Sequence, residues 1–174
     1  ENYKRSEAAL VTTMAEMVVG GVSTAKVGRV METLCGRSFS RSAVSEACRE
    51  LDGAVAEFAG RPLSDRYLFA LVDATYVKAR VGGRVVSRAL MVAVGLTDEG
   101  RKEVIGVGVY DSETAASWAD FLRGLRERGL RGLKAITTDA NEGAISAIGE
   151  VYPEVPWQRC QAHFTRNVVE AAPK

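Results

Sequence analysis

Residues 67–80 read YLFALVDATYVKAR, and the strand that they predict organises the rest of the sequence around it. The stretch begins with the continuous apolar run Leu68 to Val72, which is typical of a strand buried on both faces. Asp73 follows this run directly. Because an unpaired carboxylate is costly to bury, a carboxylate in an interior strand suggests a functional use.

Two further strands follow along the chain. Gly82 and Gly83 form a two-residue hairpin signal that leads into a second apolar stretch, residues 85–96. Asp98, Glu99 and Gly100 supply another turn before a third strand over residues 103–110. The pattern predicts three consecutive antiparallel strands.

Helices and strands alternate after residue 110. Thr114 and its polar neighbours offer N-caps to a helix whose apolar stripe starts at Trp118. Glu113 and Glu142 are interpreted as carboxylates favoured at helix N-termini, although either could lie near a metal. The order β-β-β-α-β-α-β-α predicts a mixed sheet covered on both faces, the ribonuclease-H-like architecture. Its later elements are a strand at 133–138, a helix at 142–151, a strand at 155–160 and a helix at 161–171.

The first 62 residues predict a separate helical segment, with residues 63–174 as the α/β core. Three helices are predicted, and the third carries an apolar stripe that includes Leu51, Val55 and Phe58. The second and third resemble a helix-turn-helix, in which Arg41 and Arg49 could reach DNA. A bundle that only docks on the core is an equal alternative, because residues 1–66 carry as many acidic as basic side chains.

Composition leaves the choice of partner open. The 174 residues carry a net charge of +1, so no general basic excess marks a nucleic-acid binder. Three scattered cysteines without a CxxC pair favour a reducing compartment, and the apolar runs are too short for a membrane span. We therefore expect a cytoplasmic chain without a membrane partner, and we expect it to be part of something longer.

A second aspartate has the same setting as Asp73. Asp139 closes the predicted strand at 133–138 and precedes a helix. In open sheets, ligands gather outside the carboxyl ends of strands, so Asp73 and Asp139 could share a divalent cation if their strands are neighbours. The alternative for each is a helix cap or turn former.

Several motifs together resemble the Mutator-type bacterial insertion-sequence transposases over about residues 20 to 170. The matching residues are Asp73-Ala74-Thr75-Tyr76-Val77-Lys78, Ala93-Val94-Gly95-Leu96, Asp98 to Glu103, Trp118 with Phe121-Leu122, Arg128-Gly129-Leu130, Thr138-Asp139, Glu142-Gly143, Gln158-Arg159-Cys160, His163, Arg166 and Asn167.

This resemblance implies a DDE transposase, in which two aspartates and a later glutamate bind two Mg²⁺ ions, with Mn²⁺ able to substitute. Asp73 and Asp139 would be the first two acids, and the activity would be strand cleavage and joining at insertion-sequence ends. The family's glutamate follows a helical insertion after the Cys-x-x-His segment, which this sequence does not reach. We expect the 174 residues to be inactive alone, and the alternative is a non-catalytic DNA-binding or regulatory remnant.

The remaining expectations concern DNA and zinc. Lys78 and Arg80, beyond Asp73 on one strand, are well placed near a scissile phosphate, and Arg166 is a further DNA-binding candidate. Cys160 and His163 form a structural motif, and no zinc is expected because a closed zinc site needs four ligands. By resemblance we expect double-stranded DNA as partner, a homodimer, and association with the nucleoid.

Overall fold

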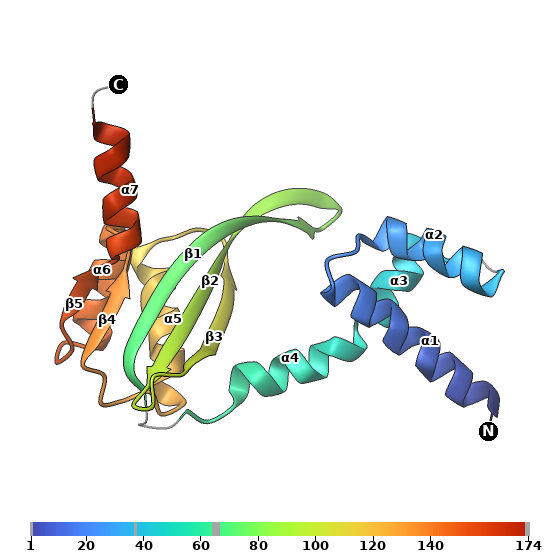
Figure 1. The fold of residues 1–174 in the computed structure, drawn as a ribbon, viewed down its shortest axis with the longest axis horizontal. Coiled ribbons are helices and arrows are strands. Elements are labelled where there is room, and N and C mark those ends of the chain that lie inside the picture. Colours follow the sequence, from blue (N-terminus) through green and yellow to red (C-terminus); the bar gives the residue numbers. More distant parts are fainter. Residues whose placement is uncertain (1, 37, 64–66, 173–174) are drawn as a thin grey trace. The chain divides into compact units, whose positions relative to one another are not determined.

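The computed structural model describes residues 2–36, 38–63 and 67–172, which divide into two compact units (Figure 1). The first unit is residues 1–60 and the second is residues 61–174.

The first unit is helical: α1 (Asn2–Val19), α2 (Thr24–Cys35), α3 (Arg41–Ala47) and α4 (Glu50–Gly60). α2 ends at Gly36, whose φ of 64° is the left-handed conformation that glycine adopts without strain. Ser40 caps α3 by accepting a hydrogen bond from the backbone N–H of Ala43. The core of this unit is small and comes from α1, α2 and α3, with Met14, Val27, Met31, Val44 and Ala47 buried.

The single third helix predicted from sequence is wrong, because the chain forms two helices there. Val44 and Ala47 are buried in the core, and the chain turns immediately after them. The N–H groups of Leu51 and Asp52 then bond to carbonyls three residues back, which is the tighter spacing of a turn. Val55 is 62% exposed, so the predicted apolar stripe does not enter this core beyond α3.

The second unit confirms the predicted element order. The strands are β1 (Tyr67–Val81), β2 (Arg84–Thr97), β3 (Lys102–Tyr110), β4 (Ala135–Thr138) and β5 (Trp157–Arg159). They form one mixed sheet in the order β3-β2-β1-β4-β5, antiparallel from β3 to β1 and parallel from β1 to β5. The helices are α5 (Ala115–Glu127), α6 (Glu142–Val151) and α7 (Gln161–Ala171).

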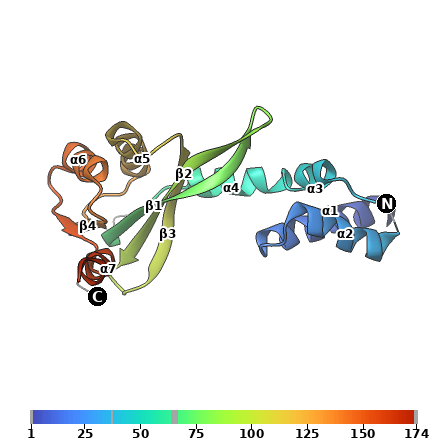
Figure 2. The same ribbon diagram turned by 90° about the horizontal axis from the view of Figure 1, so that it is seen from above.

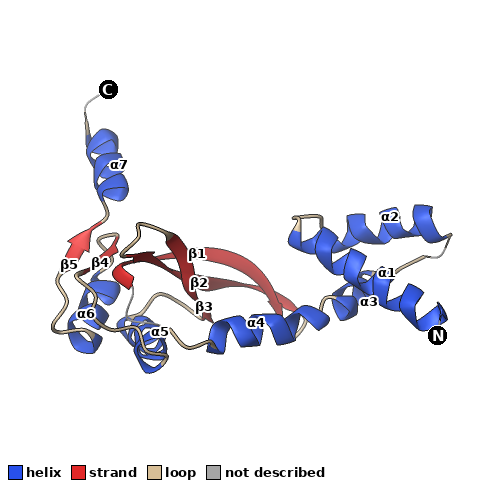
Figure 3. Cartoon of the chain, turned by 60° about the horizontal axis from the view of Figure 1, so that its bottom comes forward, coloured by secondary structure: helices blue, strands red, loops and turns tan. Residues whose placement is uncertain are grey.

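Helices α5 and α6 lie together on one face of this sheet (Figures 2 and 3). Ala70 and Val72 of β1 point into the core there, beside Trp118 and Phe121 of α5. An ion pair between Arg126 and Glu154, at 3.2 Å, and another between Arg123 and Glu150 link α5 to α6 and the residues that follow it. These contacts fix the helices that frame the ends of β1 and β4.

The opposite face of the sheet is open among the described residues, so the predicted cover on both faces is wrong. Phe69 and Leu71 are 37% and 40% exposed, while their neighbours Ala70 and Val72 are buried. An uninterrupted apolar run hides this alternation, because both faces of β1 carry apolar side chains. We call this surface the open sheet face; its most exposed members are Phe69, Leu71, Val104, Val107 and Val109.

Strands β1 and β2 continue beyond their neighbours as a two-stranded ribbon (Figure 1). Pairing of β3 with β2 stops at Ala89, and pairing of β4 with β1 stops at Leu71. We call residues 77–88 the hairpin arm. Its tip is Gly82-Gly83, with φ of 56° and 80°, which is the pattern of a type I′ turn.

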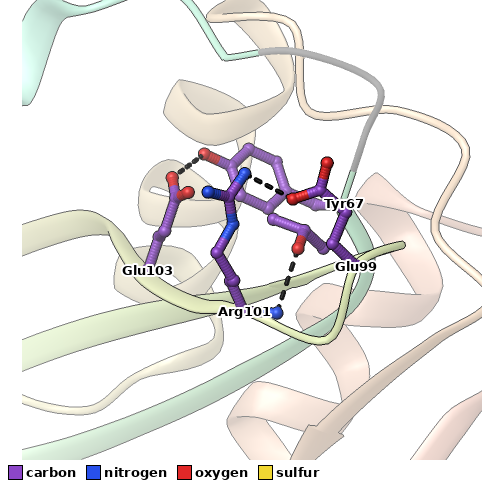
Figure 4. A network of polar contacts seen from close by, with 5 residues as sticks. Tyr67, Glu99, Arg101 and Glu103 are labelled. Atoms are coloured by element: carbon purple, nitrogen blue, oxygen red, sulfur yellow. Dashed lines mark hydrogen bonds and ion pairs between the residues drawn. The ribbon is translucent and has the colours of Figure 1, made fainter.

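A network of polar contacts surrounds the β2–β3 turn, at the end of the sheet opposite the hairpin arm (Figure 4). Tyr67 donates a hydrogen bond to Glu103 at 2.7 Å, and Arg101 pairs with Glu99 at 2.7 Å. The backbone N–H of Arg101 also donates to the hydroxyl of Thr97. The first contact joins the start of β1 to the start of β3 across β2, and the other two hold the β2–β3 turn.

No helix in the described part of the chain is both long enough and apolar enough to cross a membrane.

Candidate metal and nucleic-acid site

The parallel pairing of β1 with β4 brings the two predicted aspartates to the same edge of the sheet. Leu71 pairs with Thr137, and each aspartate lies two residues further along its own chain. Asp73 is still within β1, whereas Asp139 follows the end of β4, so both lie just beyond the paired part of these two strands. The condition for their sharing a cation, that their two strands are neighbours, is met.

Asp73 lies on the open sheet face rather than in the interior. Its side chain is exposed, and Oδ1 accepts a hydrogen bond from the backbone N–H of Ala74 at 3.0 Å. The interpretation of Asp73 as an interior carboxylate is therefore wrong, since only one face of β1 is buried. The exposure leaves this carboxylate accessible to solvent and to a large substrate.

Asp139 is half-buried and more firmly held. Its Oδ1 accepts hydrogen bonds from the backbone N–H of Asn141 at 3.0 Å and from the hydroxyl of Thr138 at 3.3 Å. Asn141 is the N-cap of α6, where its side-chain oxygen accepts from the N–H of Ala144 at 3.0 Å. The start of α6 thus orients Asp139 at the end of β4.

Glu113, between β3 and α5, is a third carboxylate beside the pair. The amide nitrogen of Asn141 donates to its Oε2 at 3.3 Å, and its backbone N–H donates to the Tyr76 hydroxyl at 3.3 Å. Burial, and then the negative charges of Asp139 and Asp73, raise the pKa of Glu113. Thr114 caps α5, one of the caps predicted from the sequence, and of the two alternatives left open for Glu113 the structure favours the one near the two aspartates.

The chemistry of these side chains suits a hard divalent cation. Carboxylate and amide oxygens are the ligands that Mg²⁺ and Mn²⁺ prefer, and soft ligands are absent from the immediate group. In the described part of the chain, no three His, Cys, Asp or Glu side chains are arranged as a ready metal cage. Asp73 and Asp139 are thus the side chains that could hold a metal, and they would need further ligands.

The predicted DNA-binding residues lie in three places. Lys78 and Arg80 are exposed on the hairpin arm, on the strand that carries Asp73. Arg41 is exposed at the start of α3, and Arg49, which follows α3, pairs with Glu46 at 2.8 Å. Arg166 is exposed on α7.

Cys160 and His163 mark the junction of β5 with α7. The backbone N–H of Cys160 donates to the carbonyl of Thr138 at 2.7 Å, which ties the start of α7 to the end of β4. Cys160 is a half-buried free thiol and the N-cap residue of α7, and His163 is half-buried one turn into the helix. The pair follows β5, which is the sheet neighbour of β4, the strand that leads into Asp139.

Comparison with known proteins identifies the family. Residues 1–174, the whole chain, match the transposases of the Mutator family. The chain belongs to this family. The resemblance expected from the sequence motifs is confirmed.

Curated relatives of this Mutator-family chain are insertion-sequence transposases. It is 44% identical over 174 residues to the transposase for insertion sequence element ISRM5 of Rhizobium meliloti. It is 42% identical over 175 residues to the transposase for insertion sequence element IS256 in transposon Tn4001 of Staphylococcus aureus. All of the chain is covered, but only 44% and 45% of these relatives, so it spans less than half of their length.

The fold has solved counterparts. The Drosophila P element transposase in its strand transfer complex superposes with a TM-score of 0.52 over 92% of this chain and 42% of that one. The sequences are 14% identical, so this likeness concerns the fold alone. The ribonuclease-H-like class predicted from the order of elements is confirmed.

Proposed function

We propose that residues 61–174 form part of the catalytic core of an insertion-sequence transposase, which cleaves and joins DNA strands by metal-dependent phosphoryl transfer. One observation carries the proposal: in a chain of the Mutator family, Asp73 and Asp139 each lie two residues beyond the last paired positions of the adjacent parallel strands β1 and β4. Membership of the family supports this class of reaction. The pairing of β1 with β4 supports Asp73 and Asp139 as the residues at which the reaction takes place.

In this proposal the two aspartates hold divalent cations at the edge of the sheet. Bound Mg²⁺ supplies positive charge to the attacking and leaving oxygens of an in-line displacement at phosphorus. The chain's own part is positional: the Asn141 N–H and the Thr138 hydroxyl fix one oxygen of Asp139, and the Ala74 N–H fixes one of Asp73. The resemblance places the third acid, a glutamate, outside these 174 residues.

DNA is the proposed partner, with the enzyme acting in the bacterial cytoplasm. Lys78 and Arg80 would contact phosphates from the hairpin arm, Arg166 would contact them from α7, and Arg41 and Arg49 would bind through the helical unit. Exposed cations on the strand that carries Asp73 suit a polyanion whose phosphate is held by metal ions. Self-association as a homodimer is part of the same proposal and comes from the resemblance.

The test measures Mn²⁺ binding to purified residues 1–174 by titration calorimetry and electron paramagnetic resonance. We expect weak binding that Asp73→Asn and Asp139→Asn each reduce at least tenfold, because each removes a charged ligand. Asp98→Asn is the matched control, since it makes the same change in the exposed β2–β3 turn.

Three outcomes would count against parts of the proposal. Mn²⁺ affinity that is equal in the wild type and in Asp73→Asn and Asp139→Asn would exclude the pair as a metal site. DNA binding without any metal binding would favour the non-catalytic remnant. Efficient Mg²⁺-dependent cleavage of transposon-end DNA by the 174 residues would show that the acids present already suffice.

A further inference from the structure

We propose that the hairpin arm, residues 77–88, is a DNA-binding ribbon that enters the major groove of duplex DNA. The inference rests on the proposed function only in taking DNA as the substrate. It assigns DNA binding to the hairpin arm. The arm is needed neither to complete the sheet nor to position the acidic pair.

The shape of the arm is the first argument. Five residues of each strand pair only with each other, from Val77 opposite Arg88 to Val81 opposite Arg84. At about 3.4 Å per residue, the arm projects about 17 Å beyond its last sheet neighbour. The major groove is about 12 Å wide and 8.5 Å deep and accepts a two-stranded ribbon of this kind.

Charge is the second argument. From Ala74 to Thr97 the sequence holds four basic residues, Lys78, Arg80, Arg84 and Arg88, and no acidic residue. Arg88 is half-buried and pairs with Asp111, whereas the other three are exposed. None of the ion pairs formed among the described residues involves Lys78, Arg80 or Arg84. A chain with a net charge of +1 thus concentrates unpaired positive charge on one projection.

The distribution of these cations suits a groove with two phosphate walls. In the strand register, Lys78 and Arg80 lie on one face of the ribbon, because alternate residues share a face. Arg84 pairs with Val81 and lies on the other face. A ribbon inserted edge-on would therefore present cations to the backbones on both sides.

The tip of the arm is suited to close approach. Gly82 and Gly83 adopt positive φ and carry no side chains, so the backbone at the turn is narrow and has room around it. Lys78 lies five residues beyond Asp73, about 17 Å along β1.

The experiment measures binding of a 30-base-pair duplex by fluorescence anisotropy, with residues 1–174 at several salt concentrations. The variant Lys78→Gln/Arg80→Gln/Arg84→Gln removes the free cations of the arm. The control Lys102→Gln/Arg131→Gln/Lys134→Gln removes the same charge from exposed sites off the arm, at the start of β3 and in the α5–β4 connection. Circular dichroism and thermal melting check that both triple variants fold.

We expect the arm variant to bind at least tenfold more weakly at 100 mM salt. Its slope of log affinity against log salt should be shallower by about three, because each lost phosphate contact contributes about 0.9. The control should change affinity less than threefold. Methyl green, a major-groove ligand, should displace the wild type, and the minor-groove ligand distamycin should not.

Equal losses in the arm and control variants would overturn the proposal, since binding would then follow net charge alone. Displacement by distamycin only would overturn the assignment of the groove. Unchanged DNA binding with altered sedimentation of the arm variant would instead make the arm a contact between copies of the chain. Mn²⁺ binding is scored separately, so a failure of the arm leaves the acidic pair untouched, and the reverse also holds.

Discussion

At the scale of single residues, Asn141 connects the parts of the candidate site. Its side chain caps α6 and also donates to Glu113, while its backbone N–H holds Asp139. The sequence singled out the two aspartates because an apolar run leads into each, and their role as metal ligands stays a prediction. It left the place of Glu113 open between a helix N-terminus and a metal site, because the choice depends on a contact between the loop before α5 and the N-cap of α6, which are far apart in sequence.

Replacing Asn141 by alanine should lower the free energy of unfolding by about 1 kcal/mol, the usual cost of losing an N-cap. The variant should also weaken Mn²⁺ binding severalfold, because Glu113 loses its amide donor and Asp139 its fixed neighbour. Asn141→Ser is the control for stability, since serine is a good cap and is too short to reach Glu113 in the same way. Urea unfolding and Mn²⁺ titration of both variants would decide; equal Mn²⁺ affinities in the two variants and the wild type would contradict the linking role.

At the scale of elements, the sequence predicted which segments form strands better than which side chains they bury. Local periodicity and turn glycines define β1, β2 and β3, and these signals are contained within each segment. Whether one or both faces of β1 are covered depends on other parts of the chain, and an all-apolar run carries no information about it. The break between α3 and α4 escaped for a similar reason, because the apolar spacing continues through the turn.

The junction of α5 with α6 offers a test within one helix. A Cβ added at Gly143 would lie 3.0 Å from the Ala115 backbone nitrogen and 3.1 Å from Asn141 Oδ1, whereas at Gly149 it would meet nothing within 4 Å. Gly149→Ala should stabilise by about 0.5–1 kcal/mol through helix propensity. Gly143→Ala should be less stable than Gly149→Ala by at least about 1 kcal/mol, because the backbone of α5 must move. Thermal and urea unfolding measure the stability of both variants. Equal stabilities would contradict the prediction, because they would show that α5 and α6 can move apart at this contact without cost.

At the scale of the whole molecule, each of the two units has its own sequence pattern, helical in the first and mixed in the second. The α/β unit has one well-packed core between the sheet and α5 and α6, and the opposite face of the sheet exposes aliphatic side chains from β1 and β3. An apolar surface of this kind is more than the scattered exposure that is normal for a folded protein. It should therefore bind apolar probes.

The dye 1-anilinonaphthalene-8-sulfonate should fluoresce with the native chain, and Leu71→Thr/Val107→Thr should reduce the signal by roughly half, because threonine keeps a strand conformation while adding a hydroxyl. The control is Val19→Thr/Leu34→Thr, which removes two side chains that are 72% and 70% exposed in the helical unit. Fluorescence titration compares them. Equal reductions by both pairs would mean that the dye does not prefer the open sheet face.

The short strand β4 gives the acidic pair an unusual dependence on the order of folding. Three paired positions join β1 to β4 and so bring Asp73 and Asp139 to neighbouring strands, although two strands and a helix separate them in sequence. Closing so long a stretch of chain loses conformational entropy before any stabilising contact between β1 and β4 has formed. The β1–β2 hairpin, in contrast, forms from local contacts. A nascent or partly unfolded chain would thus possess the hairpin before its two carboxylates lie on neighbouring strands, and the proposed metal site would form only when β4 pairs with β1.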